Sequence, residues 1–280
     1  MADTTFQTSS EYAKGLARGF TGALIFAFPL LMTMEMWQLG FYADPLKLAL
    51  FLALGLPLLF GLSYYAGFRE TDCWQDDLID ALAAYALGFV ASAVLLAMFA
   101  VLGPGMSMSE LVGKVAVQAL PAAIGAMLAR TQLKEGGGER QADAPPEERR
   151  SSYGSELFLM MVGALFLAFN VAPTEEMVLI AHQMSDAHAI VLALASLLML
   201  HALVYSVGFA GQEEGHGSGS MLRTFLHFTL AGYGIALLVS FYILWTFDRT
   251  EGAGLLTLVK TTVVLGFPAS LGAAAARLLV

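Results

Sequence analysis

Long apolar stretches separated by short polar connectors make up almost the whole chain. A helix needs about 20 mostly apolar residues to cross a bilayer core that is about 30 Å thick. Eight stretches meet that requirement, four on each side of a central polar segment. They are residues 15–39, 46–68, 78–102, 111–130, 157–177, 187–209, 221–247 and 254–279. The pattern therefore predicts an all-α membrane protein with eight transmembrane helices.

Composition agrees with this prediction. Hydrophobic residues make up 58% of the chain and charged residues 13%, and the mean hydropathy is +0.69. Such a chain has too little polar surface to cover a soluble globule of its size, so we expect the lipid bilayer as its surroundings. The net charge of −9 lies in the connectors and the central segment, and it excludes nucleic acid as an expected partner.

The first apolar helix is repeated in the second half. Residues 22–37 read GALIFAFPLLMTMEMW and residues 163–178 read GALFLAFNVAPTEEMV, and they align without a gap, so that Glu35 matches Glu176. The final helices also match, because PAAIGAMLAR and PASLGAAAAR share proline, glycine, alanines and arginine. Self-similarity over half the chain length predicts a duplicated four-helix unit.

The duplication predicts the domain organisation. Residues 1–130 form the first four-helix repeat, and residues 154–280 form the second. Between them, residues 131–153 are rich in glycine, proline and charge and are predicted to be a flexible cytoplasmic linker. Because each repeat crosses the membrane an even number of times, both have the same orientation and are parallel repeats.

Lysine and arginine residues are unevenly distributed among the connectors. With a cytoplasmic N-terminus, ten of them lie inside and four lie outside. The four outside are Lys47, Lys114, Arg249 and Lys260. Since basic residues favour the cytoplasmic side, the N-terminus, the C-terminus and the linker are predicted to be cytoplasmic.

Each copy of the repeated helix ends in a threonine followed two positions later by a glutamate, Thr33 with Glu35 and Thr174 with Glu176. A carboxylate facing lipid is costly, so each glutamate should face the bundle, a water-filled path or the headgroups. One interpretation is that each glutamate only ends a helix at the interface. The other is that the two glutamates face one another across a pseudo-two-fold axis and select cations.

The second interpretation predicts a set of oxygen ligands. Rings of carboxylates select cations in channels, and calcium prefers several carboxylate and carbonyl oxygens. Glu35 and Glu176 would be the metal-binding carboxylates. The secondary lining groups would be Thr33, Thr174, Asn170 and Glu175. Two carboxylates make a sparse ring, so we expect homo-oligomerisation to multiply them around calcium or a monovalent cation.

The preferred function is thus a cation channel or passive cation pathway. The alternatives are a proton-coupled secondary cation transporter and a membrane scaffold or sensor that transports nothing. The sequence contains no P-loop, nucleotide fingerprint, nucleophile elbow or paired catalytic motif. We therefore expect neither an enzyme nor a bound cofactor.

At the segments RGFTGALIFAFPLLMTMEMW and NVAPTEEM, the chain resembles an uncharacterised bacterial family of integral membrane proteins, domain of unknown function 2391. The resemblance covers nearly the whole length. It implies a helical membrane protein of the bacterial inner (plasma) membrane, and it carries no activity. The expectation about function therefore rests on the charged and polar side chains alone.

Overall fold

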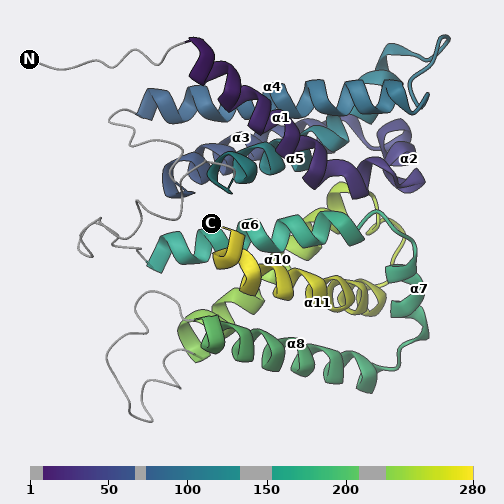
Figure 1. Cartoon of the computed structure of the whole chain (residues 1–280). Helices are drawn as coiled ribbons and strands as arrows, with labels where there is room; N and C mark the ends of the chain where they lie inside the picture. The colour runs from purple at the N-terminus through teal and green to yellow at the C-terminus, as the bar shows by residue number, and fades with distance from the viewer. Residues whose placement is uncertain (1–8, 67–73, 133–152, 208–224, 280) are drawn as a thin grey trace, which may run out of the picture. The chain divides into compact units, whose positions relative to one another are not determined.

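The computed structural model describes residues 9–66, 74–132, 153–207 and 225–279, and every regular element within these ranges is a helix (Figure 1). The predicted linker, residues 131–153, lies almost entirely outside them. In chain order the helices are α1 (Ser9–Leu31), α2 (Met34–Tyr42), α3 (Pro45–Ala66), α4 (Trp74–Met98), α5 (Met108–Gln132), α6 (Tyr153–Val171), α7 (Glu176–Gln183), α8 (Asp186–Val207), the π-helical η1 (Phe225–Leu230), α10 (Ala231–Thr246) and α11 (Leu255–Leu279).

Seven described segments are long and apolar enough to cross a membrane. The bent pair formed by α1 and α2 is an eighth candidate if it is counted as one span. The all-helical membrane architecture predicted from the apolar pattern is therefore confirmed. The helix bounds agree well where apolar length alone decides them, as in α8, whose predicted range was 187–209.

The predicted C-terminal ends of two helices are wrong. The helix predicted over 15–39 stops at Leu31, and α2 leaves it at an angle of 88°. The helix predicted over 157–177 stops at Val171, before α7 begins at Glu176. A proline lies at each break, Pro29 near the end of α1 and Pro173 after α6. Proline cannot donate a backbone hydrogen bond, so it weakens a helix at these points.

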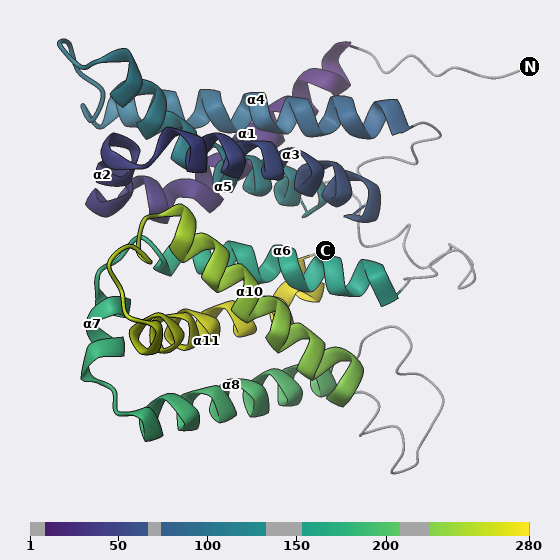
Figure 2. The same ribbon diagram turned by 180° about the vertical axis from the view of Figure 1, so that it is seen from behind.

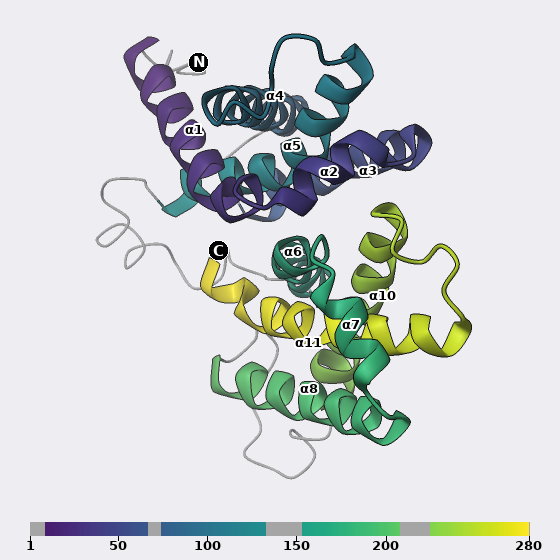
Figure 3. The ribbon, with the colours of Figure 1, turned by 90° about the vertical axis from the view of Figure 1, so that its right-hand side faces the viewer.

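The chain divides into two compact units. Unit 1 comprises Met1–Phe41 and Leu52–Gly137, and unit 2 comprises Tyr42–Phe51 and Gly138–Val280. In unit 1, α1 and α4 both pack on α5, and α1 also contacts α4. In unit 2, α6 and α10 both pack on α11, and α10 also contacts α6. Helix α8 adds to unit 2 by packing on α11 and meeting η1 (Figure 2), while α7 lies against α11 (Figure 3).

Glycines permit close helix crossings at the same matched positions of both units. In unit 1, a Cβ added at Gly125 would lie 2.4 Å from the Phe26 Cβ and 2.9 Å from the Gly22 carbonyl oxygen. In unit 2, a Cβ added at Gly163 or Gly272 would lie 2.1 Å from the carbonyl oxygen of the other glycine. Small residues let membrane helices approach until their backbones touch, which explains these matching crossings of α1 with α5 and α6 with α11.

The first residues of α3 group with unit 2, although the sequence places them in the first half. Phe51 packs against Phe169 and Phe247, with ring centroids 5.6 and 6.1 Å apart, and all three side chains are buried. Edge-to-face and tilted aromatic pairs add to the free energy gained by apolar burial. This aromatic cluster ties Tyr42–Phe51 to α6 and to the end of α10.

Candidate functional site

The first helix break, between α1 and α2, is closed by local hydrogen bonds. The Thr33 hydroxyl donates to the Leu30 carbonyl at 2.8 Å, and the Thr33 backbone N–H donates to the same carbonyl at 3.1 Å. The Trp37 indole N–H donates to the Leu31 carbonyl at 2.8 Å. A helix end leaves its last carbonyls without helical partners, and at membrane depth these groups need other donors. Thr33 thus ends α1, and Trp37 holds α2 against that end.

The second helix break, between α6 and α7, uses the same threonine contacts. The Thr174 hydroxyl and backbone N–H donate to the Val171 carbonyl at 2.9 and 3.1 Å. The Asn170 amide donates to the Phe166 carbonyl at 2.8 Å. The threonine and asparagine side chains predicted to line an ion path therefore lie at the breaks. There, each donates a hydrogen bond to a backbone carbonyl at the end of its own long helix.

Arg249 connects the second break to the turn between α10 and α11. Its guanidinium donates to the Pro173 carbonyl, and Nη1 lies 3.8 Å from Glu175 Oε1. The arginine side chain is 15% exposed, whereas that of Glu175 is 81% exposed. Of the two contacts that Arg249 makes, the one with the Pro173 carbonyl is therefore the buried one. The sequence did not predict the contact of Arg249 with the second break, because no local pattern joins residues so far apart in the chain.

Glu35 and Glu176 occupy matching places in the short helices. Glu35 is partly buried in the first turn of α2, and Glu176 is the exposed first residue of α7. Within the described part of the chain, neither carboxylate makes a hydrogen bond or an ion pair. The positive end of a helix dipole favours a carboxylate in its first turn, which gives both residues a structural role at the breaks.

Every basic side chain in the predicted outer connectors is paired with a carboxylate. The pairs are Lys47 with Asp248 and Glu251, Lys114 with Glu110, Arg249 with Glu175, and Lys260 with Asp186. None of these four basic groups pairs with Glu35 or Glu176. The four bases therefore leave the two repeated glutamates uncompensated.

Three carboxylates are buried within candidate spans. Asp77 and Asp80 of α4 are 3% and 5% exposed, and Glu156 of α6 is 1% exposed. The Ser63 hydroxyl donates to Asp77 at 3.0 Å. Acidic side chains inside membrane segments are costly and commonly take part in ion or proton movement, so these three are further candidates that the sequence search did not select.

A buried amide in α5 was also missed. Gln118 is fully buried, and neither its side-chain oxygen nor its nitrogen has a hydrogen-bond partner. The Ser92 hydroxyl of α4 is likewise buried without a partner. The only sequence signal was a glutamine within an apolar helix, which does not reveal whether the amide is satisfied.

The carboxylates do not assemble into a tight metal site in the part of the chain that the structure describes. There, no three His, Cys, Asp or Glu side chains lie close enough together to hold one ion.

Comparison with known proteins agrees with the membrane architecture. The family model described as "Putative integral membrane protein (DUF2391)" matches residues 15–280, which confirms the resemblance found at the repeated segments. No curated protein and no solved structure matches the chain.

Proposed function

The chain belongs to this family of integral membrane proteins, and we propose that it is a cation channel or passive cation pathway whose outer end attracts ions through Glu35 and Glu176. The observation that carries this proposal is the charge balance at the helix breaks. All four basic side chains of the outer connectors are neutralised by carboxylates, whereas the two repeated glutamates are not.

Counting the connector charges supports the same conclusion. Residues 32–47, 99–114, 172–188 and 247–260 contain eight carboxylates and four basic side chains. An excess of one charge sign at a pore entrance raises the local concentration of the opposite ion. In the part of the chain that the structure describes, three of these carboxylates are not held in ion pairs: Glu35, Glu176 and Asp44. The Asp44 carboxylate accepts hydrogen bonds from the Leu46 and Lys47 backbone N–H groups at the start of α3, so Glu35 and Glu176 are the two that make no such contact there.

The proposal assigns different roles to the other residues of the repeated motif. Thr33, Thr174 and Asn170 end the long helices through their backbone hydrogen bonds. Glu175 contacts Arg249. Ion attraction thus rests on two carboxylates per chain, and we propose that copies of the chain assemble so that several pairs surround the path.

The proposal includes two parallel four-helix repeats in the bacterial inner membrane with cytoplasmic termini. Two observations support the repeats: the threonine contacts are the same at both breaks, and matched glycines form the crossings in both units. Parallel repeats place both breaks at the same membrane face. The four basic residues outside, against ten inside, support the orientation.

A proton-coupled cation transporter is a second candidate because Asp77, Asp80 and Glu156 are buried within candidate spans. Such carboxylates serve proton relays in many transporters. A transporter of this kind requires a proton gradient to drive cation movement, whereas a channel conducts down either cation gradient. The two candidates therefore separate on the response of flux to pH.

The test is cation flux into liposomes that contain the purified full chain, with sodium, potassium and calcium measured separately. We expect Glu35→Gln and Glu176→Gln each to lower flux by about fivefold, the effect of one unit charge at roughly 4 Å in water. Glu251→Gln is the matched control, because it removes an exposed carboxylate while Lys47 retains Asp248. Flux that needs an opposing proton gradient would favour the transporter.

Two results would overturn the cation pathway. The first is flux that Glu35→Gln and Glu176→Gln reduce no more than Glu251→Gln does. The second is no flux of any of the three ions from protein that elutes as a single species, which would favour a scaffold or sensor.

A further inference from the structure

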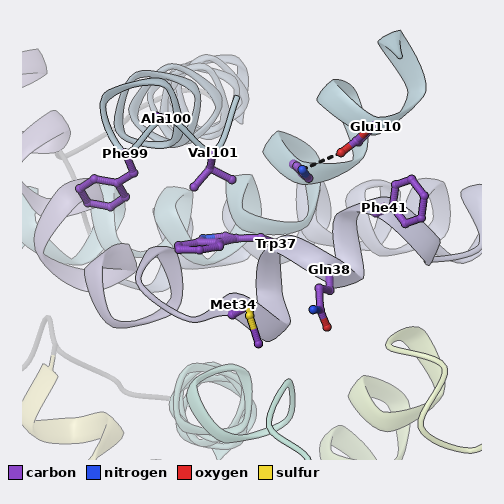
Figure 4. Close-up of a pocket in the computed structure, with 9 residues that line it drawn as sticks. Met34, Trp37, Gln38, Phe41, Phe99, Ala100, Val101 and Glu110 are labelled. Atoms are coloured by element: carbon purple, nitrogen blue, oxygen red, sulfur yellow. Dashed lines mark ion pairs between the residues drawn. The ribbon is translucent and has the colours of Figure 1, made fainter. Parts of the chain in front are cut away.

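Unit 1 contains a cavity of about 570 Å³ beside the first helix break (Figure 4). Its walls come from α2, from the residues that follow α4 and from the start of α5. The lining residues that matter here are Trp37, Phe41, Phe99, Val101, Glu110 and Lys114. The cavity is largely open to its surroundings, and its volume is within the range of sites that hold small organic molecules. All of the lining residues belong to unit 1.

The turn beside this cavity has a close counterpart in unit 2. Ala100 and Asp248 follow α4 and α10 with positive φ angles of 56° and 58°. The next residues, Val101 and Arg249, donate backbone hydrogen bonds to the carbonyls of Leu96 and Leu244, both at 2.9 Å. Val101 and Arg249 therefore occupy equivalent positions in the two turns.

The side chains at these equivalent positions differ in length and charge. In unit 2, Arg249 reaches from its turn to the Pro173 carbonyl at the helix break. In unit 1, Val101 is too short to reach across, and the space between it and Trp37 is part of the cavity (Figure 4). Valine at this position therefore leaves the turn of unit 1 without the long side chain that Arg249 provides in unit 2.

One end of the cavity carries a charged pair. Lys114 Nζ lies 2.7 Å from Glu110 Oε1, and the two side chains are 11% and 20% exposed. An ammonium has three donors and a carboxylate has about four acceptor sites, so both groups keep capacity for a ligand. Gln38 adds one amide, and the remaining walls are aromatic and apolar. A fitting ligand carries both charges at its head and an apolar body.

We propose that this cavity binds the headgroup of a zwitterionic phospholipid with a primary ammonium group, as in phosphatidylethanolamine. The lipid phosphate accepts hydrogen bonds from Lys114, and the lipid ammonium donates to Glu110. Trp37 is the kind of residue that lies at the headgroup level of a bilayer. Met34 and Phe41, which border the cavity, are 57% and 68% exposed and provide apolar surface for the acyl chains.

The charges also predict which lipids are excluded. The headgroup of phosphatidylglycerol is anionic, so Lys114 attracts it while Glu110 repels it. Its net binding free energy from this charged pair is therefore smaller. The trimethylammonium of phosphatidylcholine cannot donate a hydrogen bond to Glu110. We therefore expect the ethanolamine lipid to bind about tenfold more tightly than the other two, as a charge-assisted hydrogen bond allows.

Trp37 provides a direct readout of this site. The chain contains three tryptophans, and the double variant Trp74→Phe, Trp245→Phe leaves Trp37 as the single fluorophore. This protein is reconstituted in vesicles that contain brominated phosphatidylethanolamine, phosphatidylglycerol or phosphatidylcholine at equal mole fractions. Bromine quenches only on contact, so quenching reports the lipid beside Trp37. We expect the strongest quenching from the ethanolamine lipid.

Two variants test the cause of the preference in the same background. Glu110→Gln with Lys114→Met removes the charged pair together, so no unpaired charge remains, and it should abolish the preference among lipids. Val101→Arg should reduce quenching by all three lipids, because an arginine fills the cavity as Arg249 bridges its own break. The unfolding temperature of each variant in detergent is measured as a control and should equal that of the parent. A change in quenching then reports loss of lipid and not loss of fold.

Equal quenching by the three lipids in the parent protein would overturn the proposal, because it describes ordinary contact with the bilayer. A preference that survives removal of the charged pair would overturn it as well. Stronger quenching by the glycerol lipid would assign the site to anionic headgroups instead.

Discussion

The two helix breaks solve the same problem with donors from different places. At both breaks a threonine hydroxyl closes the end of the long helix at matching carbonyls. At the first break, a further carbonyl is satisfied from within the next helix by the Trp37 indole. At the second break, a further carbonyl is satisfied from the distant α10–α11 turn by Arg249.

This difference shows that the local pattern determines where a break occurs, while long-range contacts determine what surrounds it. A broken membrane helix needs donors for its free carbonyls, whichever segment supplies them. At the second break the donor is an arginine that reaches across from a neighbouring turn. At the first break the donor is an indole within the short helix, and the cavity of unit 1 lies beside it.

The largest effects should come from the helix crossings that hold each break in place. Gly272→Ala places a Cβ 2.1 Å from the Gly163 carbonyl oxygen, a backbone atom that cannot rotate away. We expect a loss of about 3 kcal/mol in the free energy of unfolding, the upper end of overpacking costs. Gly125→Ala should cost somewhat less, because its closest contacts are longer, 2.4 Å to the Phe26 Cβ, which is also fixed to its backbone, and 2.9 Å to the Gly22 carbonyl oxygen. Reversible unfolding in mixed detergent micelles measures both.

The control for these glycine variants is Gly234→Ala in α10, where an added Cβ has no neighbour within 4 Å. It should be neutral or slightly stabilising, since alanine favours a helix over glycine. Equal losses at Gly125 and Gly272 would contradict the comparison between the two crossings.

The next effect concerns the arginine of unit 2. Arg249→Met keeps most of the side-chain length but leaves the Pro173 carbonyl without its donor. Hydrogen bonds to charged groups contribute about 2 kcal/mol, so we expect a loss of that size in unfolding free energy. Arg249→Lys retains one charged donor and should recover part of it. If Arg249→Met unfolds like the parent protein, the arginine does not stabilise the second break.

Substitutions at two matched core positions, one in α5 and one in α11, should have smaller effects on the free energy of unfolding. Gln118 and Leu265 correspond through the repeated final helices, and both are fully buried. Gln118→Leu removes an amide that has no partner and should stabilise the protein by about 1–2 kcal/mol. Leu265→Gln should destabilise unit 2 by a similar amount. A loss of stability in Gln118→Leu would indicate that the amide is satisfied by water or an ion, and cation flux measured on the same variant would show whether transport depends on it.

Much of the fold could be predicted from apolar length, because a run such as that of α8 has one way to satisfy its backbone in lipid. The breaks could not be predicted in this way. Apolar residues continue on both sides of Thr33, and hydropathy carries no information about helix direction. The threonines are visible in the sequence, but the pattern there predicts lining groups for ions, whereas in the structure Thr33 and Thr174 end the long helices.

The positions of the candidate site residues follow from the sequence, whereas their role stays a prediction. The repeated Thr-x-Glu segments identified Glu35 and Glu176, which the structure places in the first turns of the short helices. Their surroundings were not predictable. The pairing of Lys114 with Glu110 follows helical spacing, but that of Lys260 with Asp186 joins α11 to the start of α8 and depends on tertiary packing.

The smallest expected effect tests the donor of unit 1. Trp37→Phe keeps an aromatic ring against the first break but removes the hydrogen bond to the Leu31 carbonyl. We expect a loss of about 1 kcal/mol in unfolding free energy, the usual net value of such a bond. Trp74→Phe is the control, because Trp74 is 63% exposed at the start of α4. A smaller loss for Trp37→Phe than for Arg249→Met would show that the break with the open cavity is also the one whose donor is less costly to remove. Equal losses would mean that both breaks depend on their donors alike.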